Sequence, residues 1–469
     1  MLGRPAARAL AYTVAAVALA SLSSPALAGT IDYSDGSTIS TPLTLSEAAT
    51  LNVATGAATQ SGAFGESVAG TPVTKIGAGT LTLSAVNSYT GLTTIAGGTL
   101  KLGIANAVAA SSGVLVQSGA IFDITGSNQT IGNLNLESGS TVSIGANRLI
   151  VLDSANTVWS GTTHGTADTG QIVKAGSGTV TLNNYTQDGG ELHIAGGSAA
   201  LTSGTSTVWY YSVGSGTGGT GTMTMSGGAL NISGGPGGSL EPALQVGDWG
   251  GTGTMNQTGG TVTVTGGGVN IGNQGGTGTY NISAGSLNLM GGLSNLGRNT
   301  RTNPPGSGTL NISGTGLVVV DTDGSSAGRL IIGNRDGTST VGQGSGTINQ
   351  TGGTLRVGAS SGLYLSAYGN GTYNLSGGTL QIGGTSLHAR YAGSGTYAFN
   401  LGGGTVQTYG SALTAAVNAT LVTGTTSTID TNGLGTTWSG VLSGAGALKK
   451  SAKARSRYPA TTLTRVARR

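Results

Sequence analysis

A short unit punctuated by glycine recurs along most of this chain and limits the folds open to it. A Gly-Thr pair is followed by an apolar residue, then Asn or Thr, then a Gly-Gly or Ala-Gly turn and a second short β-prone run. Successive pairs lie 24 to 38 residues apart. They begin at Gly221, Gly253, Gly278, Gly308, Gly346, Gly371 and Gly395. Units this short cannot each bury a hydrophobic face, so they must stack on one another.

The alternation inside the units predicts an all-β chain. Residues 80–83 and 261–264 alternate with the period of two that is typical of strands. We therefore expect an elongated right-handed parallel β-solenoid, with Leu, Ile and Val turned inward and Thr, Ser and Asn facing solvent or forming ladders. A β-propeller also repeats short strands, but its blades need about 40–50 residues, which is longer than several of the spacings.

Composition excludes several other classes. Glycine accounts for 90 of 469 residues, but it is not every third residue and there are only 9 prolines, so the chain is not collagen. Disorder fits badly, because 37% of the residues are hydrophobic and only 8% are charged. Cysteine is absent, which excludes a disulfide scaffold and a thiolate metal site and suits passage of an unfolded chain through a narrow pore.

The net charge of +4 is unevenly distributed. Ten of the 20 basic residues lie in the first 28 or the last 21 positions, whereas all 16 acidic residues lie between them. The intervening chain therefore carries about −6 by the same count. A basic stripe of the kind that binds nucleic acid is not expected.

The N-terminus resembles a secretory signal peptide. Arg4 and Arg8 precede an apolar run, and Ala26 and Ala28 form a small-x-small cleavage site before Gly29. An uncleaved membrane anchor is the alternative, but the apolar run is short. We expect cleavage after Ala28 and export of the mature chain.

Two segments carry a more specific motif. The first reads Lys-Ile-Gly-Ala-Gly-Thr-Leu-Thr-Leu-Ser from residue 75, then Asn-Ser-Tyr-Thr-Gly from 87 and Ala-Gly-Gly-Thr-Leu from 96. The second reads Lys-Ala-Gly-Ser-Gly-Thr-Val-Thr-Leu from residue 174 and keeps only part of the tyrosine turn, at 184–186. Both resemble the autotransporter-associated β-strand repeat, or passenger-associated transport repeat. In the first copy the motif positions are Lys75, Gly77, Gly79, Thr80, Leu81, Leu83, Asn87, Tyr89, Gly91, Gly98 and Leu100.

This resemblance implies bacterial type V secretion, in which the Sec machinery exports a passenger that then crosses the outer membrane through a β-barrel at its own C-terminus. It suggests five segments: a signal peptide (1–28), an N-terminal β cap (29–74), a passenger-associated repeat region (75–203), a β-solenoid (204–448) and a basic tail (449–469). The mature chain is expected at the cell surface, attached to the outer membrane or extracellular.

The basic tail does not fit the rest of the sequence. Its last 20 residues contain no glycine, and no run of barrel-like strands precedes them. Read one base out of frame, residues 453–468 permit Gly-Thr-Leu-Thr-Leu-Ser-Gly-Asn-Asn-Thr-Tyr-Thr-Gly, which is another repeat. We therefore expect a frameshift near Ser451 and Ala452, with further repeats and a barrel in the parent gene. A genuine basic tail is the alternative.

Motifs associated with catalysis are isolated here. His164, His193 and His388 are far apart and lack metal-ligand spacing, so each is expected in a turn or at the surface. Residues 324–328 and 358–362 match G-x-S-x-G without a strand-to-helix elbow. Residues 214–219 match G-x-G-x-x-G without a following helix. None predicts an active site or a cofactor.

Two further patterns have structural explanations. Asp321 and Asp323 begin like a calcium loop but lack the remaining acidic ligands, so an Asx-capped turn is expected. Six Asn-x-Ser/Thr sequences recur at a similar place in the units, which predicts a structural asparagine at a solenoid corner and not a glycan. Their asparagines are Asn231, Asn256, Asn281, Asn311, Asn349 and Asn374.

The densest charge lies in the longest inter-repeat segment, at Arg298, Arg301, Asp321, Asp323, Arg329, Arg335 and Asp336. If stacking brought Asp323, Arg329 and Asp336 together, a polysaccharide lyase or glycosidase site would be conceivable; solvated loops are the simpler expectation. The favoured function is a non-catalytic, adhesin-like or structural passenger with no cofactor, whose possible ligand is a cell-surface glycan or protein. A fragment without a function of its own is the third possibility.

Overall fold

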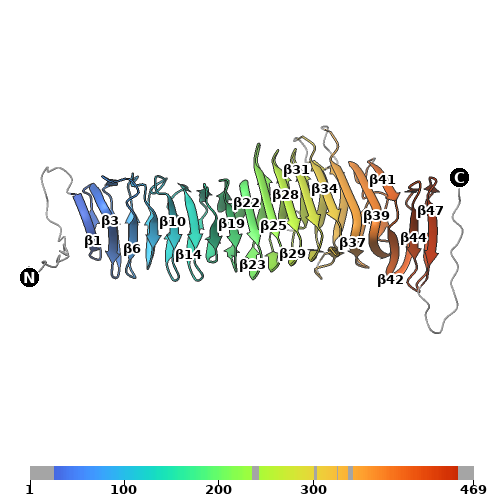
Figure 1. Ribbon diagram of the computed structural model, residues 1–469, viewed down its shortest axis with the longest axis horizontal. Coiled ribbons are helices and arrows are strands. Elements are labelled where there is room, and N and C mark those ends of the chain that lie inside the picture. Colours follow the sequence, from blue (N-terminus) through green and yellow to red (C-terminus); the bar gives the residue numbers. More distant parts are fainter. Residues whose placement is uncertain are drawn as a thin grey trace, which may run out of the picture. The chain divides into compact units, whose positions relative to one another are not determined.

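A computed structural model describes residues 26–234, 242–299, 304–324, 326–335, 342–393 and 395–452. These residues form β-strands and turns, and none of them is helical. The chain divides into two compact units after Gly190, and the short strands of each unit lie side by side (Figure 1). The Gly-Thr repeats fall in the second unit.

The first unit stacks its coils in parallel on two continuous rows of strands and a third, interrupted one. One row contains β1 (Ala26–Tyr33), β3 (Leu43–Val53), β6 (Val73–Ile76), β8 (Thr93–Ile95), β10 (Gly113–Val116), β13 (Asn133–Leu136), β16 (Thr157–Trp159) and β19 (Thr179–Leu182). The next contains β2 (Thr38–Ile39), β4 (Ala57–Gln60), β7 (Thr80–Leu83), β9 (Thr99–Leu102), β11 (Ile121–Asp123), β14 (Thr141–Gly145), β17 (Thr162–Gly165) and β20 (Thr186–Asp188). The third contains β5 (Phe64–Glu66), which pairs with the start of β3, and then β12 (Gln129–Ile131), β15 (Arg148–Val151) and β18 (Gln171–Lys174).

The second unit has three faces, again with parallel pairing from coil to coil. The first face contains β22 (Gly196–Leu201), β25 (Thr220–Met225), β28 (Thr252–Gln257), β31 (Thr277–Ile282), β34 (Ser307–Ile312), β37 (Ser345–Val357), β39 (Asn370–Gly384), β41 (Thr396–Leu401), β43 (Ala419–Leu421) and β46 (Leu442–Ser443). The second face contains β23 (Thr205–Val208), β26 (Ala229–Ile232), β29 (Thr261–Thr265), β32 (Ser286–Met290), β35 (Leu317–Asp321), the ends of β37 and β39, β42 (Thr405–Ala415), β44 (Thr426–Asp430) and β47 (Ala447–Ser451), while β45 (Thr436–Trp438) pairs with the end of β42. The third face contains β21 (Glu191–Ile194), β24 (Tyr210–Ser215), β27 (Leu244–Asp248), β30 (Val269–Asn273), β33 (Leu293–Asn299), β36 (Arg329–Arg335), β38 (Gly362–Tyr364) and β40 (Leu387–His388).

Alternate side chains point into a narrow core. In β29, Val262 and Val264 are buried while Thr261 and Thr263 are half-buried. Equivalent inward positions stack from coil to coil, as Met255, Tyr280 and Leu310 do in β28, β31 and β34. This in-register parallel pairing confirms the β-solenoid and excludes the propeller, whose four-stranded blades are antiparallel.

The Gly-Thr pairs set the register of the first face. Gly221, Gly253, Gly278, Gly308, Gly346 and Gly371 each pair with the next in the series. The seventh Gly-Thr pair departs from this register, because Gly371 pairs with Tyr397 and Asn370 pairs with Thr396, so Gly395 lies outside the glycine row. That register instead stacks the buried Phe399 on Tyr373, with ring centroids 5.1 Å apart.

Two glycine rows pack against each other where the third face meets the first. A Cβ on Gly278 would lie 2.0 Å from the Val246 carbonyl oxygen and 2.4 Å from the Gly272 nitrogen. Gly272 has φ +72, and a Cβ there would lie 1.9 Å from the Ser307 carbonyl oxygen. Only glycine, which has no Cβ, permits the two backbone rows to approach this closely. In the third-face row the positive φ is a second reason why glycine is needed. That row consists of Gly214, Gly247, Gly272, Gly297 and Gly333.

The recurrent asparagines have a structural role, but most of them lie inside strands of the first face and not at corners. Asn281, Asn311, Asn349, Asn374 and Asn400 each donate from Nδ2 to the Oδ1 of the asparagine one coil earlier, at 2.7 to 3.0 Å. This asparagine ladder consists of Asn256, Asn281, Asn311, Asn349, Asn374 and Asn400. Asn231 is not part of it, because it lies in β26 on the second face and pairs with Thr263. Ladders were expected, and the structure confirms them.

Candidate functional site

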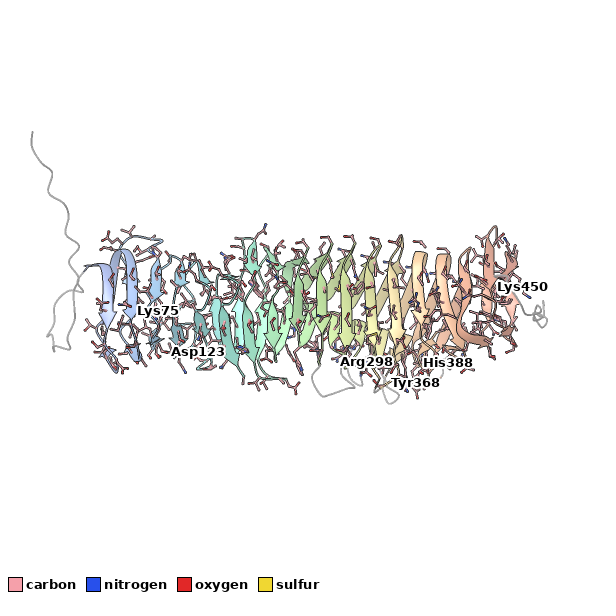
Figure 2. The ribbon with its side chains drawn as sticks, turned by 90° about the horizontal axis from the view of Figure 1, so that it is seen from below. Lys75, Asp123, Arg298, Tyr368, His388 and Lys450 are labelled. Atoms are coloured by element: carbon pink, nitrogen blue, oxygen red, sulfur yellow. The ribbon has the colours of Figure 1, made fainter. Side chains whose placement is uncertain are left out.

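The lysine of the first motif occupies a core position. Lys75 is fully buried in β6, where its register neighbours are Leu51 and Ile95 (Figure 2). Its Nζ donates to the carbonyl oxygens of Ile76 at 2.8 Å, Gly77 at 3.0 Å and Gly97 at 3.1 Å. Burial lowers the pKa of Lys75 to about 8. Because Gly97 belongs to the next coil, the ammonium joins two successive coils.

Asn87 makes a second connection across coils. Its side chain is buried; Oδ1 accepts from the Phe64 nitrogen at 2.8 Å and Nδ2 donates to the Ala107 carbonyl at 2.8 Å. The two partners lie on either side of Asn87 along the stack. One amide therefore satisfies backbone groups of both neighbours, and no apolar residue could do so.

The tyrosine and glycines of the motif fill and shape the same turn. Tyr89 is fully buried, and its hydroxyl lies 2.8 Å from the Thr93 Oγ1. A Cβ on Gly91 would lie 2.2 Å from the Thr71 carbonyl oxygen, and one on Gly77 would lie 2.2 Å from the Val53 carbonyl oxygen. The remaining apolar positions of the motif are buried in β7 and β9: Leu81, Leu83 and Leu100. Thr80 is half-buried on the outer side of β7, and Gly79 and Gly98 lie in tight turns where a Cβ would collide with backbone.

The second motif repeats the lysine with a different neighbour. Lys174 in β18 is buried, and its Nζ donates to the Gly176 carbonyl at 2.6 Å. Burial lowers its pKa, and the nearby Asp153 opposes that shift. Tyr185, which follows after a shorter turn, is buried and donates to the Thr163 Oγ1 at 3.0 Å. The buried cation and the buried tyrosine are thus common to both copies.

Comparison with known protein families gives two matches, at residues 73–102 and 172–198, both to the passenger-associated-transport-repeat family. The chain carries passenger-associated transport repeats. No curated protein and no solved structure matches the chain. The matches coincide with the two buried lysines, which confirms the resemblance and fits an autotransporter passenger.

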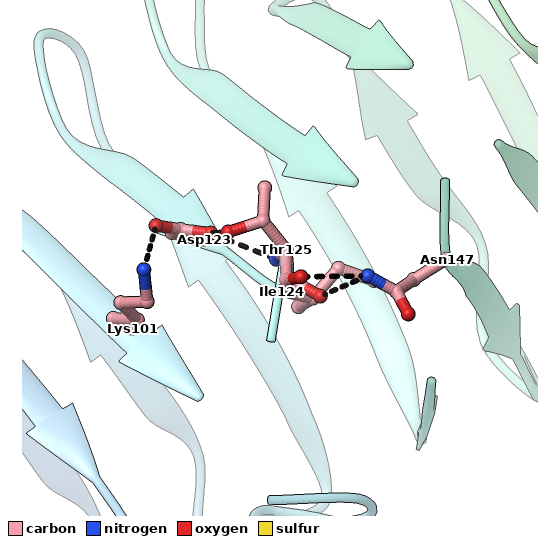
Figure 3. Close-up of polar contacts among 5 residues, drawn as sticks. All are labelled: Lys101, Asp123, Ile124, Thr125 and Asn147. Atoms are coloured by element: carbon pink, nitrogen blue, oxygen red, sulfur yellow. Dashed lines mark hydrogen bonds and ion pairs between the residues drawn. The ribbon is translucent and has the colours of Figure 1, made fainter. Parts of the chain in front are cut away.

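The first transport repeat spans two coils. Residues 73–102 comprise β6 to β9, in which β6 pairs with β8 and β7 pairs with β9. At its end, the Lys101 Nζ lies 3.5 Å from an Asp123 carboxylate oxygen, and Asp123 also accepts from Thr125 (Figure 3). Asn147 donates to the carbonyls of Ile124 and Thr125 and continues this surface network to a further coil.

The histidines lie in strands, which corrects the expectation for one of them. His193 in β21 is mostly buried; its Nε2 lies 2.8 Å from the Glu191 Oε2 and its ring lies 5.6 Å from that of Tyr210. His164 is an exposed residue of β17 beside Asp188. His388 in β40 is half-buried, and burial lowers its pKa. The described residues contain no group of His, Asp and Glu suited to holding a metal ion.

The charged residues of the long inter-repeat segment have separate partners. Asp321 Oδ1 accepts from the Thr322 nitrogen at 2.8 Å and Asp323 Oδ1 accepts from the Ser326 nitrogen at 2.7 Å, so both aspartates bond to the backbone of a turn, but neither bond reaches the residue two positions on as in an Asx turn. Arg329 instead donates to the Tyr391 hydroxyl at 3.3 Å. Arg298 is buried in β33, Arg335 ends β36, and Arg301 and Asp336 lie outside the described residues.

The serine and glycine motifs lie in turns and at the adjoining ends of strands. In residues 324–328 the Ser326 Oγ accepts from the Gly292 nitrogen, and no helix follows either this motif or residues 358–362 and 214–219. Among the residues the structure describes, no helix is long and apolar enough to cross a membrane.

Residues 358–362 nevertheless border a cavity of about 230 Å³ that the sequence did not reveal. Arg329, Tyr364 and His388 line it from β36, β38 and β40. Tyr364 and His388 are register partners in neighbouring coils. They are 24 positions apart, which matches the repeat spacing, so that spacing is the sequence signal that could have predicted their contact.

Proposed function

We propose that this chain is the exported passenger of an autotransporter, with a structural or adhesin-like role at the cell surface and no catalytic activity. The observation that carries the proposal is the pair of transport repeats within a parallel β-solenoid. Its partners would be the Sec machinery, an outer-membrane β-barrel of its own and a surface glycan or protein ligand. The signal peptide with cleavage after Ala28, the segment boundaries and the shifted frame after Ser451 belong to the same proposal.

The repeat would aid secretion by coil-by-coil folding. Each coil needs only its neighbour as a template, since stability in a solenoid is the sum of local and nearest-neighbour contributions. Lys75 and Asn87 form hydrogen bonds with backbone groups of adjacent coils. Each coil that emerges from the membrane would therefore find hydrogen-bond donors and acceptors already in place on the coil folded before it. Folding outside the cell would then draw the chain outward without ATP.

The test is surface display of the full chain fused to a translocating outer-membrane barrel in a Gram-negative host. Protease shaving should release a folded passenger that begins at Gly29, and Ala28→Asp should block processing. Gly91→Ala should lower the displayed amount several-fold, because its Cβ would lie 2.2 Å from the Thr71 carbonyl oxygen. Gly97→Ala is the matched control, since its nearest contact would be 3.5 Å. Equal display of the two variants, or no display of the parent chain, would contradict the proposal.

A further inference from the structure

The cavity lies on the third face of the second unit, where three consecutive coils bring equivalent turns together. β36, β38 and β40 pair in parallel, and the turns that precede them contribute Ala327, Ser361 and Ser386 to the lining. Its volume of about 230 Å³ is smaller than that of sites for drug-sized ligands. A single ring fits such a space.

One wall of the cavity is aromatic and held in place by its neighbours. The rings of Tyr364 and His388 stack with centroids 4.4 Å apart and planes 8° apart, and Tyr391 packs edge-on against Tyr364 at 5.0 Å. A Cβ on Gly362 would lie 2.6 Å from the Tyr364 ring, so the ring's position depends on glycine there. The wall is therefore formed before any ligand arrives.

Two polar side chains of the cavity, Ser361 and Arg329, could bind a ligand. Ser361 is 7% exposed, and its Oγ has no hydrogen-bond partner. Buried hydroxyls are usually paired, so this one can still form a hydrogen bond with a further group. Arg329 is exposed, its guanidinium lies 5.6 Å from the Tyr391 ring centroid, and it forms no ion pair with a carboxylate of the described residues.

We propose that this cavity binds one sugar ring bearing a carboxylate, as in a uronic acid unit of an acidic glycan. Arg329 would pair with the carboxylate, the Ser361 hydroxyl would bond a ring hydroxyl, and the apolar side of the ring would pack on the Tyr364–His388 wall. A single guanidinium matches a monovalent carboxylate in bidentate geometry. Burial lowers the pKa of His388, so the imidazole adds no second positive charge at neutral pH. None of the described residues that line the cavity is a carboxylate, so the site as described is suited to binding and not to acid–base cleavage.

This inference rests on the adhesin-like role proposed above, and it supplies the chemical class of the ligand. The test is isothermal titration of the purified full chain with glucuronic acid and with galacturonic acid. Glucose is the control that keeps the ring without the carboxylate, and acetate keeps the carboxylate without the ring. A uronic acid should bind at least tenfold more tightly than either control. Equal binding of glucose would refute the role of Arg329, equal binding of acetate would refute the sugar ring, and no binding of either uronic acid would overturn the site.

Single-residue variants distinguish an effect on ligand binding in the cavity from an effect on folding. Arg329→Gln should weaken uronate binding about tenfold or more, as expected for loss of a charge-assisted pair. Ser361→Ala should weaken it several-fold without lowering the melting temperature, because the hydroxyl has no partner in the free protein. Arg148→Gln, at an exposed arginine of β15 in the first unit, is the control and should bind as the parent does. Loss of binding in that control, or unchanged binding in Arg329→Gln, would contradict the proposal. Surface display should be unaffected by Arg329→Gln, so failure of binding and failure of export are distinguishable.

Discussion

The asparagine ladder makes a quantitative prediction about neighbouring substitutions. Asn281, Asn311 and Asn349 each take part in two ladder hydrogen bonds, one toward each neighbouring coil. Replacing any one of them by alanine therefore removes two bonds. With a net contribution of about 1 kcal/mol per hydrogen bond, each single variant should lose about 2 kcal/mol of unfolding free energy. Asn256→Ala, at the start of the ladder, removes one bond and should lose about half as much.

Double variants test whether the bonds act as a ladder. Asn311→Ala combined with Asn349→Ala removes three bonds, because the two residues share one, whereas Asn281→Ala combined with Asn349→Ala removes four. The adjacent pair should therefore be less destabilising than the sum of its singles by about 1 kcal/mol, while the separated pair should be additive. Urea unfolding followed by circular dichroism gives the free energies, and hydrogen exchange in β31, β34 and β37 localises the loss. Additivity in both pairs would refute the reasoning.

Three further predictions concern the core and the coil contacts. Gly278→Ala should lower the free energy of unfolding in urea by about 1–3 kcal/mol or more, because its Cβ would lie 2.0 Å from a backbone carbonyl. Gly402→Ala is the control: its nearest contact would be at 3.5 Å, and it should change the same free energy by less than about 0.5 kcal/mol. Similar losses in both variants would contradict the packing argument. Lys75 has a folded pKa of about 8, below the roughly 10.4 of an unfolded lysine. The unfolded state therefore binds more protons across that window, and the unfolding free energy should rise from about pH 8 to about pH 10.4. Lys75→Met should remove this residue's share of the rise, and an unchanged slope would count against the burial of the charge. The Tyr373 hydroxyl donates to the Gln350 Oε1 at 2.5 Å in the core, so Tyr373→Phe should lose about 1–3 kcal/mol by leaving that oxygen unpaired. Combining it with Gln350→Leu should lose less than the sum of the two singles, and strict additivity would show that the pair is not coupled.

The repeating part of the fold follows from the sequence because parallel in-register stacking places the same residue at the same position in each coil. The recurrence of Gly-Thr predicted that the units stack, and in the structure Gly221 through Gly371 are indeed in register. Gly395 is out of register because the dipeptide does not set the register alone. The inward column containing Tyr373 and Phe399 does so as well, and burial of a large aromatic ring outweighs one glycine.

The candidate sites were harder to predict because they depend on contacts between coils. No sequence rule places a lysine between Leu51 and Ile95; Lys75 fits there only because three turn carbonyls converge on its Nζ. His193 was expected in a turn or at the surface because the three histidines are far apart and lack metal-ligand spacing; its ring is covered by Tyr210, which belongs to the neighbouring strand β24. The cavity joins three turns from separate coils, and the residues that these turns contribute to its lining form no cluster of ionisable residues in the sequence that would point to a site.

The first transport repeat contains a complete interface between two coils. An isolated coil has no neighbour to cover its edges, and its exposed backbone groups oppose folding. Residues 73–102 provide two paired coils, and the bond from Lys75 to Gly97 lies entirely within them. Burying that ammonium is unfavourable unless both coils are present, because only then are its three carbonyl acceptors assembled. The lysine therefore makes the two coils depend on each other, and residues 75–97, which contain the lysine and its three acceptors, lie within the matched segment.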